Sequence, residues 1–176
     1  MFSRPGRLSI VLFIFSSASS QACNYEDYLF TVESYQPAFE KFLVHSELTV
    51  GDLNGRIVEA VYPVCDGGRH SNFVDFYVSN GTVRLVGNSV SFGGAADAER
   101  YYEDLLTYLS GEYKLGQSRA VHGEGGVVSE RHALLTDQSD GITLNLSMVP
   151  EYDFKEYTVY LESYFGSYNP LMEEVR

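Results

Sequence analysis

A short polar turn, "CDGGRH" at residues 65–70, groups side chains that could bind or act on a ligand. Its two glycines permit a tight or left-handed backbone, so that Asp66, Arg69 and His70 could converge. One interpretation makes this turn a binding loop. The other, which its ordinary turn residues favour, makes it a plain connection between two strands.

A second glycine-rich stretch, "VHGEGGVVSERH" at residues 121–132, sets His122 close to Glu124. An imidazole near a carboxylate could carry out acid–base catalysis. The spacing matches no phosphate-binding pattern, because no G-x-G-x-x-G follows a strand and no lysine completes a P-loop. A connection between strands is the simpler interpretation.

The sequence predicts no metal and no cofactor. It contains no H-x-x-x-H spacing and no C-x-x-C pair, so zinc is not expected. The nucleophile elbow G-x-S-x-G is missing as well. The four histidines are His45, His70, His122 and His132. Each is more simply a surface or strand residue than a ligand.

The first 22 residues have the three parts of a secretory signal peptide. Arg4 and Arg7 make the start positive, the apolar run "LSIVLFIF" follows, and small residues lead to Cys23. This run is far shorter than the roughly 20 residues that a membrane-spanning helix needs. We therefore expect an exported protein, periplasmic or extracellular, whose mature chain begins at Cys23.

The two cysteines pose a choice between a disulfide and a lipid anchor. Two cysteines in an exported chain pair most simply with each other, since export compartments are oxidising. A Cys23–Cys65 bond would close a loop of about 40 residues and stabilise the fold by roughly 3–4 kcal/mol. A lipoprotein signal normally has an aliphatic residue three positions before the cysteine, where this chain has Ser20. The disulfide is the favoured prediction.

The chain is strongly acidic, with 24 Asp and Glu against 12 Lys and Arg. Loss of Arg4 and Arg7 with the leader would leave 10 basic side chains and a formal charge of −14. Such a charge disfavours nucleic acid and anionic membranes as partners and favours a basic protein. The competing explanation is that the acidity serves solubility alone.

One long helix is expected over residues 95–114. Its apolar residues fall on a single helical stripe and the charged residues on the opposite side. Lys114 suits the C-terminal end of the dipole, and Gly116 suits a stop. The stripe consists of Ala98, Tyr101, Tyr102, Leu105, Leu106, Leu109 and Tyr113.

Strands are expected on both sides of that helix. Asn80-Gly81 between two apolar runs predicts a type I′ hairpin, with Val74, Phe76 and Val78 facing the core. In "ITLNLSMV" and "EYTVYLESYF" apolar and polar residues alternate, as they do in half-buried strands. The inward set is Ile142, Leu144, Leu146, Met148, Tyr157, Val159 and Leu161.

These patterns predict an α+β fold with a mostly antiparallel sheet of five to six strands. The long helix would cover one face, and a short helical segment, opened by Pro37, would precede the strands. After the signal peptide, residues 23–165 would form a single domain and residues 166–176 a flexible tail.

Tyrosine and phenylalanine are abundant, with 14 and 11 residues, and tryptophan is absent. Phe73, Tyr77, Tyr160 and Tyr164 are expected on the face opposite the core. Left uncovered, they would make an aromatic surface suited to a protein partner. The alternative is that the N-terminal helices cover that face.

The leading functional hypothesis is an exported, non-enzymatic binding protein. It could be a periplasmic inhibitor of the immunity type, which would block a basic protein partner through its acidic surface and the residues proposed above. The first alternative is a small exported hydrolase that uses Asp66 and His70 together with His122 and Glu124. The second is an envelope component anchored by a lipid on Cys23.

Overall fold

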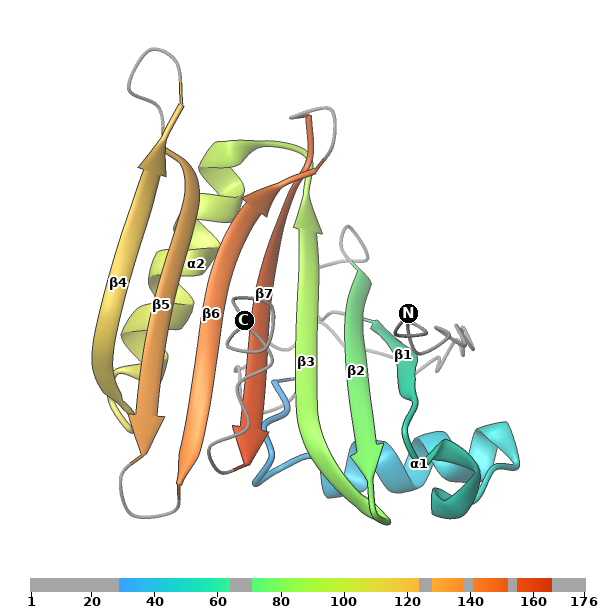
Figure 1. Cartoon of the computed structure of the whole chain (residues 1–176). Helices are drawn as coiled ribbons and strands as arrows, with labels where there is room; N and C mark the ends of the chain where they lie inside the picture. Colours follow the sequence, from blue (N-terminus) through green and yellow to red (C-terminus); the bar gives the residue numbers. More distant parts are fainter. Residues whose placement is uncertain (1–28, 64–70, 124–127, 138–140, 152–154, 166–176) are drawn as a thin grey trace, which may run out of the picture. The chain divides into compact units, whose positions relative to one another are not determined.

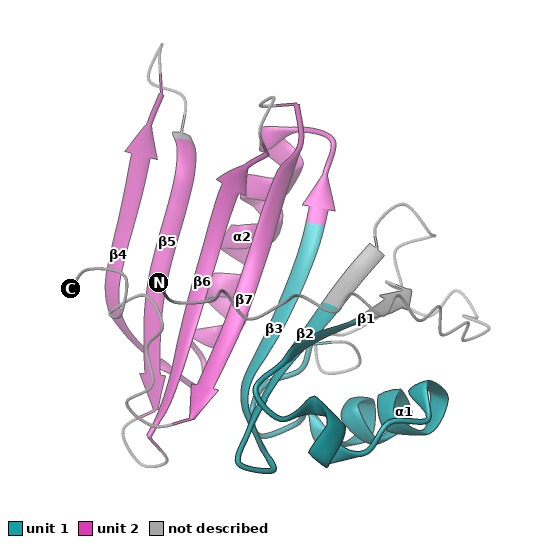
Figure 2. Ribbon diagram, turned by 45° about the vertical axis from the view of Figure 1, so that its right-hand side comes forward, with its two compact units in different colours: residues 1–90 teal, residues 91–176 magenta. Residues whose placement is uncertain are grey.

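The computed structural model describes residues 29–63, 71–123, 128–137, 141–151 and 155–165. In these residues the chain is an α+β protein with one antiparallel sheet of seven strands and two α-helices (Figure 1). The predicted fold class is therefore confirmed, although the sheet has more strands than the five to six expected. The chain divides into two compact units, Met1–Val90 and Ser91–Arg176, with the boundary inside one strand (Figure 2).

Unit 1 contains one α-helix, a short 3-10 helix and the first three strands. The strands pair as two successive antiparallel ladders, β1 with β2 and β2 with β3. Asn80 and Gly81 join β2 to β3 with φ angles of +52° and +72°, as a type I′ turn requires. The elements are α1 (Gln36–Ser46), η2 (Val50–Leu53), β1 (Ile57–Pro63), β2 (Ser71–Ser79) and β3 (Thr82–Phe92).

The core of unit 1 forms between α1 and one side of β2. Phe39 and Phe42 of α1 lie against Phe76, with ring centroids 5.1 and 6.4 Å away. Val74, Phe76 and Val78 are fully buried, which confirms the predicted inward set. Because side chains alternate along a strand, α1 packs on the side opposite Tyr77 rather than over it.

A buried asparagine ties the segment before α1 to β3. The Asn88 side chain accepts a hydrogen bond from the Phe30 backbone N–H at 3.1 Å and donates one to the Phe30 carbonyl at 2.7 Å. Leu29 and Val32 on either side are buried. In this segment Leu29 and Phe30 lack regular secondary structure, and a turn begins at Val32.

Unit 2 contains the long helix and four strands in a meander. The strands lie in the spatial order β7-β6-β5-β4, each antiparallel to its neighbour. Gly141, with a φ of +67°, precedes β6 in the β5–β6 connection. The elements are α2 (Ala95–Leu109), β4 (Lys114–His122), β5 (Val128–Asp137), β6 (Ile142–Pro150) and β7 (Tyr157–Phe165).

The long helix is shorter than predicted, because α2 ends at Leu109 and not at residue 114. Ser110 donates its hydroxyl to the Leu106 carbonyl at 2.7 Å, and Gly111, a poor helix former, follows. Tyr113 lies beyond the end of the helix but is buried, with 7% of its surface exposed. Its burial explains why an apolar residue continues the helical spacing there. Lys114, predicted to end the helix, is the first residue of β4.

The core of unit 2 lies between α2 and one face of strands β5 to β7. Ala98, Tyr102, Leu105 and Leu109 of α2 are buried, as the stripe predicted. Figure 1 shows α2 running along one face of these strands. The inward set predicted for β6 and β7 is confirmed, since each of its members is 0–8% exposed.

Candidate binding face of unit 2

The side of β4–β7 opposite α2 is lined mainly by polar side chains, and we call it the polar face. Strand register brings its residues into rows that cross the sheet. One row joins Arg119, His132, Ser147 and Tyr160 as successive Cα partners. The next row joins Gln117, Leu134, Asn145 and Glu162 in the same way. Residues from four strands, 45 positions apart in sequence at the extremes, therefore lie side by side.

Exposure on this face is greatest at β4. Near β7, Thr158 and Tyr164 are 3% and 2% exposed, and Ser147 of β6 is 8% exposed. His132, Leu134 and Asn145 are half-buried. On β4 every residue is exposed except Val121, which is half-buried. The accessible part of the polar face is thus the part nearest β4.

Hydrogen bonds fix the β6–β7 part of the face. Glu162 accepts a hydrogen bond from the Tyr164 hydroxyl at 2.7 Å and another, to the same oxygen, from Asn145 Nδ2 at 3.0 Å. This bond uses one of the two N–H donors of Asn145 Nδ2, so the second N–H and Oδ1 remain to meet a ligand. Glu162 in turn is already committed to two donors.

His132 lies beside Glu130, its neighbour two positions earlier on the same strand face. Nε2 of His132 is 3.4 Å from a Glu130 carboxylate oxygen, which is a long contact for a hydrogen bond. The pair combines an acid and a base on an accessible surface. The contact orients the imidazole loosely and leaves Nδ1 without a hydrogen bond in the described part of the chain.

A shallow cavity of about 440 Å³ opens between β4, β5 and β6. Gln117, Arg119, His132, Leu134 and Asn145 line it from the polar face, and Ser118 and Ala133 complete the lining. Its volume lies in the range of sites for small molecules or single side chains. Arg119 is its one permanently charged group. Within the described residues, no carboxylate and no hydrogen-bond acceptor contacts the guanidinium of Arg119.

β4 is an edge strand, since β5 is its single neighbour among the strands that the structure describes. The β4–β5 register shifts between Leu115 and Gln117 and again between Val121 and His122. A side chain on Gly116, at the first shift, would bring its Cβ within 3.5 Å of the Leu134 carbonyl. Between these irregularities Gln117–Val121 forms a regular five-residue segment.

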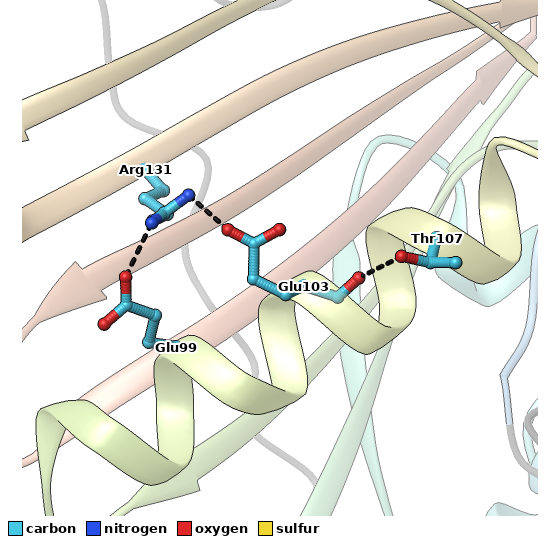
Figure 3. Close-up of polar contacts among 4 residues, drawn as sticks. All are labelled: Glu99, Glu103, Thr107 and Arg131. Atoms are coloured by element: carbon cyan, nitrogen blue, oxygen red, sulfur yellow. Dashed lines mark hydrogen bonds and ion pairs between the residues drawn. The ribbon is translucent and has the colours of Figure 1, made fainter.

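On the opposite, helix side of the sheet, Arg131 joins β5 to α2. It forms ion pairs with Glu99, at 2.6 Å, and with Glu103 (Figure 3). Its guanidinium also lies 5.8 Å from the Tyr102 ring centroid. Burial raises the pKa of Tyr102 to about 12, while the positive charge of Arg131 opposes that rise. These groups hold α2 on the sheet and are remote from the polar face.

The predicted aromatic surface is only partly accessible. Tyr160 and Tyr164 do lie on the face opposite the core, but Tyr160 is half-buried and Tyr164 is buried. Tyr77 is half-buried on the corresponding side of β2 in unit 1. The Phe73 backbone pairs with Val61, and its side chain lies outside the described part. Of this set, Tyr160 and Tyr77 retain accessible area.

The two glycine-rich loops fall largely outside the described residues. The candidate residues that lie outside the described part are Asp66, Arg69, His70 and Glu124. Cys23 and Cys65 lie outside it as well. His122 is described and is exposed at the end of β4. The proposed hydrolase arrangement and the disulfide therefore stay predictions.

Sequence reasoning overlooked the cavity. It placed Asn145 on an outward strand face, yet it assigned no strand to residues 114–122 and so could not place Arg119 and Gln117 beside Asn145. The one available signal was that "KLGQSRAVH" carries two basic residues and no acidic one in an acidic chain.

Neither family models nor curated proteins nor solved structures match this chain in the comparisons made. Within the described residues, no group of three His, Cys, Asp or Glu side chains could hold a metal ion. The helices described are also too short or too polar to cross a membrane. The candidate site therefore rests on the geometry of β4, β5 and β6.

Proposed function

We propose that the protein is an exported, non-enzymatic binding protein that docks an extended segment of a protein partner along β4. The observation that carries the proposal is the exposure of this strand, in which eight of nine residues are exposed and one is half-buried. The leader and the acidic composition support the compartment and the charge of the partner.

Strand addition suits the geometry of β4. An edge strand directs the N–H and C=O groups of alternate residues away from its neighbour, so they remain available for a further strand. In β4 the regular segment Gln117–Val121 offers this template, and the shifts at its two ends limit its length. A partner would gain backbone hydrogen bonds here and specificity from side chains beside the strand.

A second copy of the same chain is a poor occupant of this edge. Lys114 and Arg119 are the charged residues of β4, and neither has an acidic neighbour on that strand. Antiparallel pairing of two β4 strands would bring these cations near one another, which is unfavourable. The edge is therefore better suited to a different protein than to self-association.

The charge of the whole protein supports a basic partner. A net charge of −12, or −14 after loss of the leader, would steer a basic protein toward this molecule and speed its association. An inhibitor of the immunity type would use that attraction to reach its target and the β4 edge to hold it. The local cations of β4 then act on the docked segment alone.

Two adjacent proline substitutions test the docking strand. Consecutive residues of a strand direct their N–H groups to opposite sides, so one of Ser118→Pro and Arg119→Pro removes a β4–β5 bond and the other an outward donor. We expect one variant to lose roughly 2–3 kcal/mol of unfolding free energy and the other to keep a nearly wild-type Tm. Thermal unfolding of both variants assigns the two roles.

The outward-facing proline variant is then the probe for binding. A basic protein captured from the exported fraction of the native host should protect the amides of residues 117–121 from hydrogen exchange. It should bind this variant roughly tenfold more weakly, since the proline removes the outward N–H donor at its position. A captured partner that leaves β4 amides unprotected, or binds both proteins equally, rules out β4 as the docking strand.

A further inference from the structure

The cavity on the polar face holds an arginine whose charge is not matched by any residue that the structure describes. Of the three arginines that the structure describes in unit 2, Arg100 pairs with Asp97, and Arg131 pairs with two glutamates. Arg119 makes no ion pair and no side-chain hydrogen bond with any residue in the described part of the chain. In a chain with 24 acidic side chains this is a distinctive position for a cation.

Two carboxylates on the polar face are engaged by other groups. Glu162 accepts hydrogen bonds from Tyr164 and Asn145, and Glu130 lies beside His132. Neither glutamate is among the residues that line the cavity. The site therefore presents a fork of guanidinium donors without a carboxylate of its own to satisfy them.

The remaining lining groups define the rest of a ligand. Leu134 is half-buried and provides apolar surface, while the Gln117 amide and Asn145 Oδ1 provide hydrogen-bonding positions. Asn145 is held in place by Glu162, so its free oxygen is presented in a fixed orientation. A guanidinium next to an apolar patch and one oriented amide matches a carboxylate that carries a short apolar chain.

We propose that this cavity is a binding site for a carboxylate group, which Arg119 holds in a bidentate manner while the adjoining carbon atoms pack on Leu134. The carboxylate can belong to a free small acid or to an acidic side chain of a segment docked on β4. The site goes beyond the proposed function, because a free acid can occupy it whether or not a strand is added at β4.

Paired acid and amide probes test the carboxylate. Hexanoate and hexanamide have the same carbon chain, as do two acetylated pentapeptides with a central Glu or Gln. Each is titrated into the mature protein at about 0.15 M salt while backbone amide NMR signals are followed. We expect hexanoate or the Glu peptide to shift signals of residues 117–119, 132–134 and 145, and its matched amide to bind about tenfold more weakly.

Three variants identify the group responsible. Arg119→Gln should abolish the difference between acid and amide, and Arg119→Lys should restore only part of it, because lysine lacks the planar fork. Arg84→Gln is the matched control, since Arg84 is also an exposed strand arginine without a side-chain partner and belongs to unit 1.

The outcomes distinguish a free acid from an acidic side chain as the source of the carboxylate. They also test the carboxylate site separately from strand docking at β4. Shifts with hexanoate assign the site to a free acid, whereas shifts with the Glu peptide alone assign it to an acidic side chain. Equal binding of acid and amide, unchanged binding to the Arg119→Gln variant, or no shift with either acid at 20 mM overturns the carboxylate site. Protection of the amides of residues 117–121 from hydrogen exchange by a captured partner judges strand docking independently of these results.

Discussion

At the scale of single residues, Tyr102 and Arg131 show how a buried phenol and a half-buried cation share one environment. Tyr102 is 2% exposed, and its ring face is close enough to the Arg131 guanidinium for a cation–π contact. The same guanidinium ties Glu99 and Glu103 to β5. Its Nε is buried without a hydrogen-bond partner among the described residues. The cost of burying that N–H group reduces the net stabilisation that the two ion pairs contribute.

The raised pKa of Tyr102 predicts a loss of stability at high pH. The pKa is 10.0 for an unperturbed tyrosine and about 12 in the folded protein, mainly because burial disfavours the phenolate. Above pH 10 the unfolded chain ionises this group while the folded protein does not. The contribution of this group to the free energy of unfolding is therefore fully present below pH 10. It falls as the pH rises from 10 to 12, by at most about 2–3 kcal/mol.

Urea unfolding of the wild-type protein and the Tyr102→Phe variant at pH 8, 10 and 11 measures this effect. Phenylalanine cannot ionise, so the variant should lose less stability than the wild type between pH 8 and 11. Parallel curves for the two proteins would show that Tyr102 ionises equally in the folded and unfolded states.

At the scale of elements, the β2–β3 hairpin depends on the backbone angles of its turn. Gly81 has a φ of +72°, and a Cβ at this position would meet no atom within 4 Å, so conformational strain alone opposes a side chain. Gly81→Ala should therefore cost about 1 kcal/mol of unfolding free energy. Gly93→Ala is the control, because that site is equally open and its φ is outside the positive region.

Chemical denaturation of both glycine variants measures the change in unfolding free energy that each substitution causes. Gly93→Ala should be neutral or slightly stabilising, since alanine restricts the unfolded chain. A cost that is equal in the two variants would mean that the positive φ at Gly81 is not the cause.

The elements that the sequence predicted well are those with one buried face. In α2 and β6 the spacing of apolar residues reproduces the spacing of buried positions, because burial is what selects apolar side chains. β4 was not predicted because both of its faces are exposed, so its sequence shows no alternation of apolar and polar residues. The cavity escaped with it, since a site built across β4, β5 and β6 depends on register, which a single sequence does not encode locally.

The end of α2 illustrates a second limit. Tyr113 is buried and continues the stripe of the helix, but Ser110 and Gly111 end the helical backbone before it. Periodicity measures burial and not backbone conformation. A buried residue just beyond a helix therefore extends the predicted helix by several positions.

At the scale of the whole molecule, the chemical state of Cys23 distinguishes two predictions. In one, Cys23 forms a disulfide with Cys65; in the other, it carries a lipid anchor. Intact mass spectrometry of the protein from its native host, before and after reduction, tests the prediction. We expect a chain that starts at Cys23 and gains about 2 Da, the mass of two hydrogens, on reduction. A mass increased by acyl chains would instead establish Cys23 as the anchor and favour the envelope component.

The bond between Asn88 and Phe30 has a consequence for the order of events during synthesis. Asn88 satisfies both backbone groups of Phe30, much as a neighbouring strand would, across a separation of 58 residues. Because a chain is synthesised from its N-terminus, Phe30 emerges from the ribosome long before Asn88. The leading segment therefore has to wait, without this partner, until β3 has emerged and paired with β2. Any factor that guards the nascent protein against premature association would find its substrate in that interval.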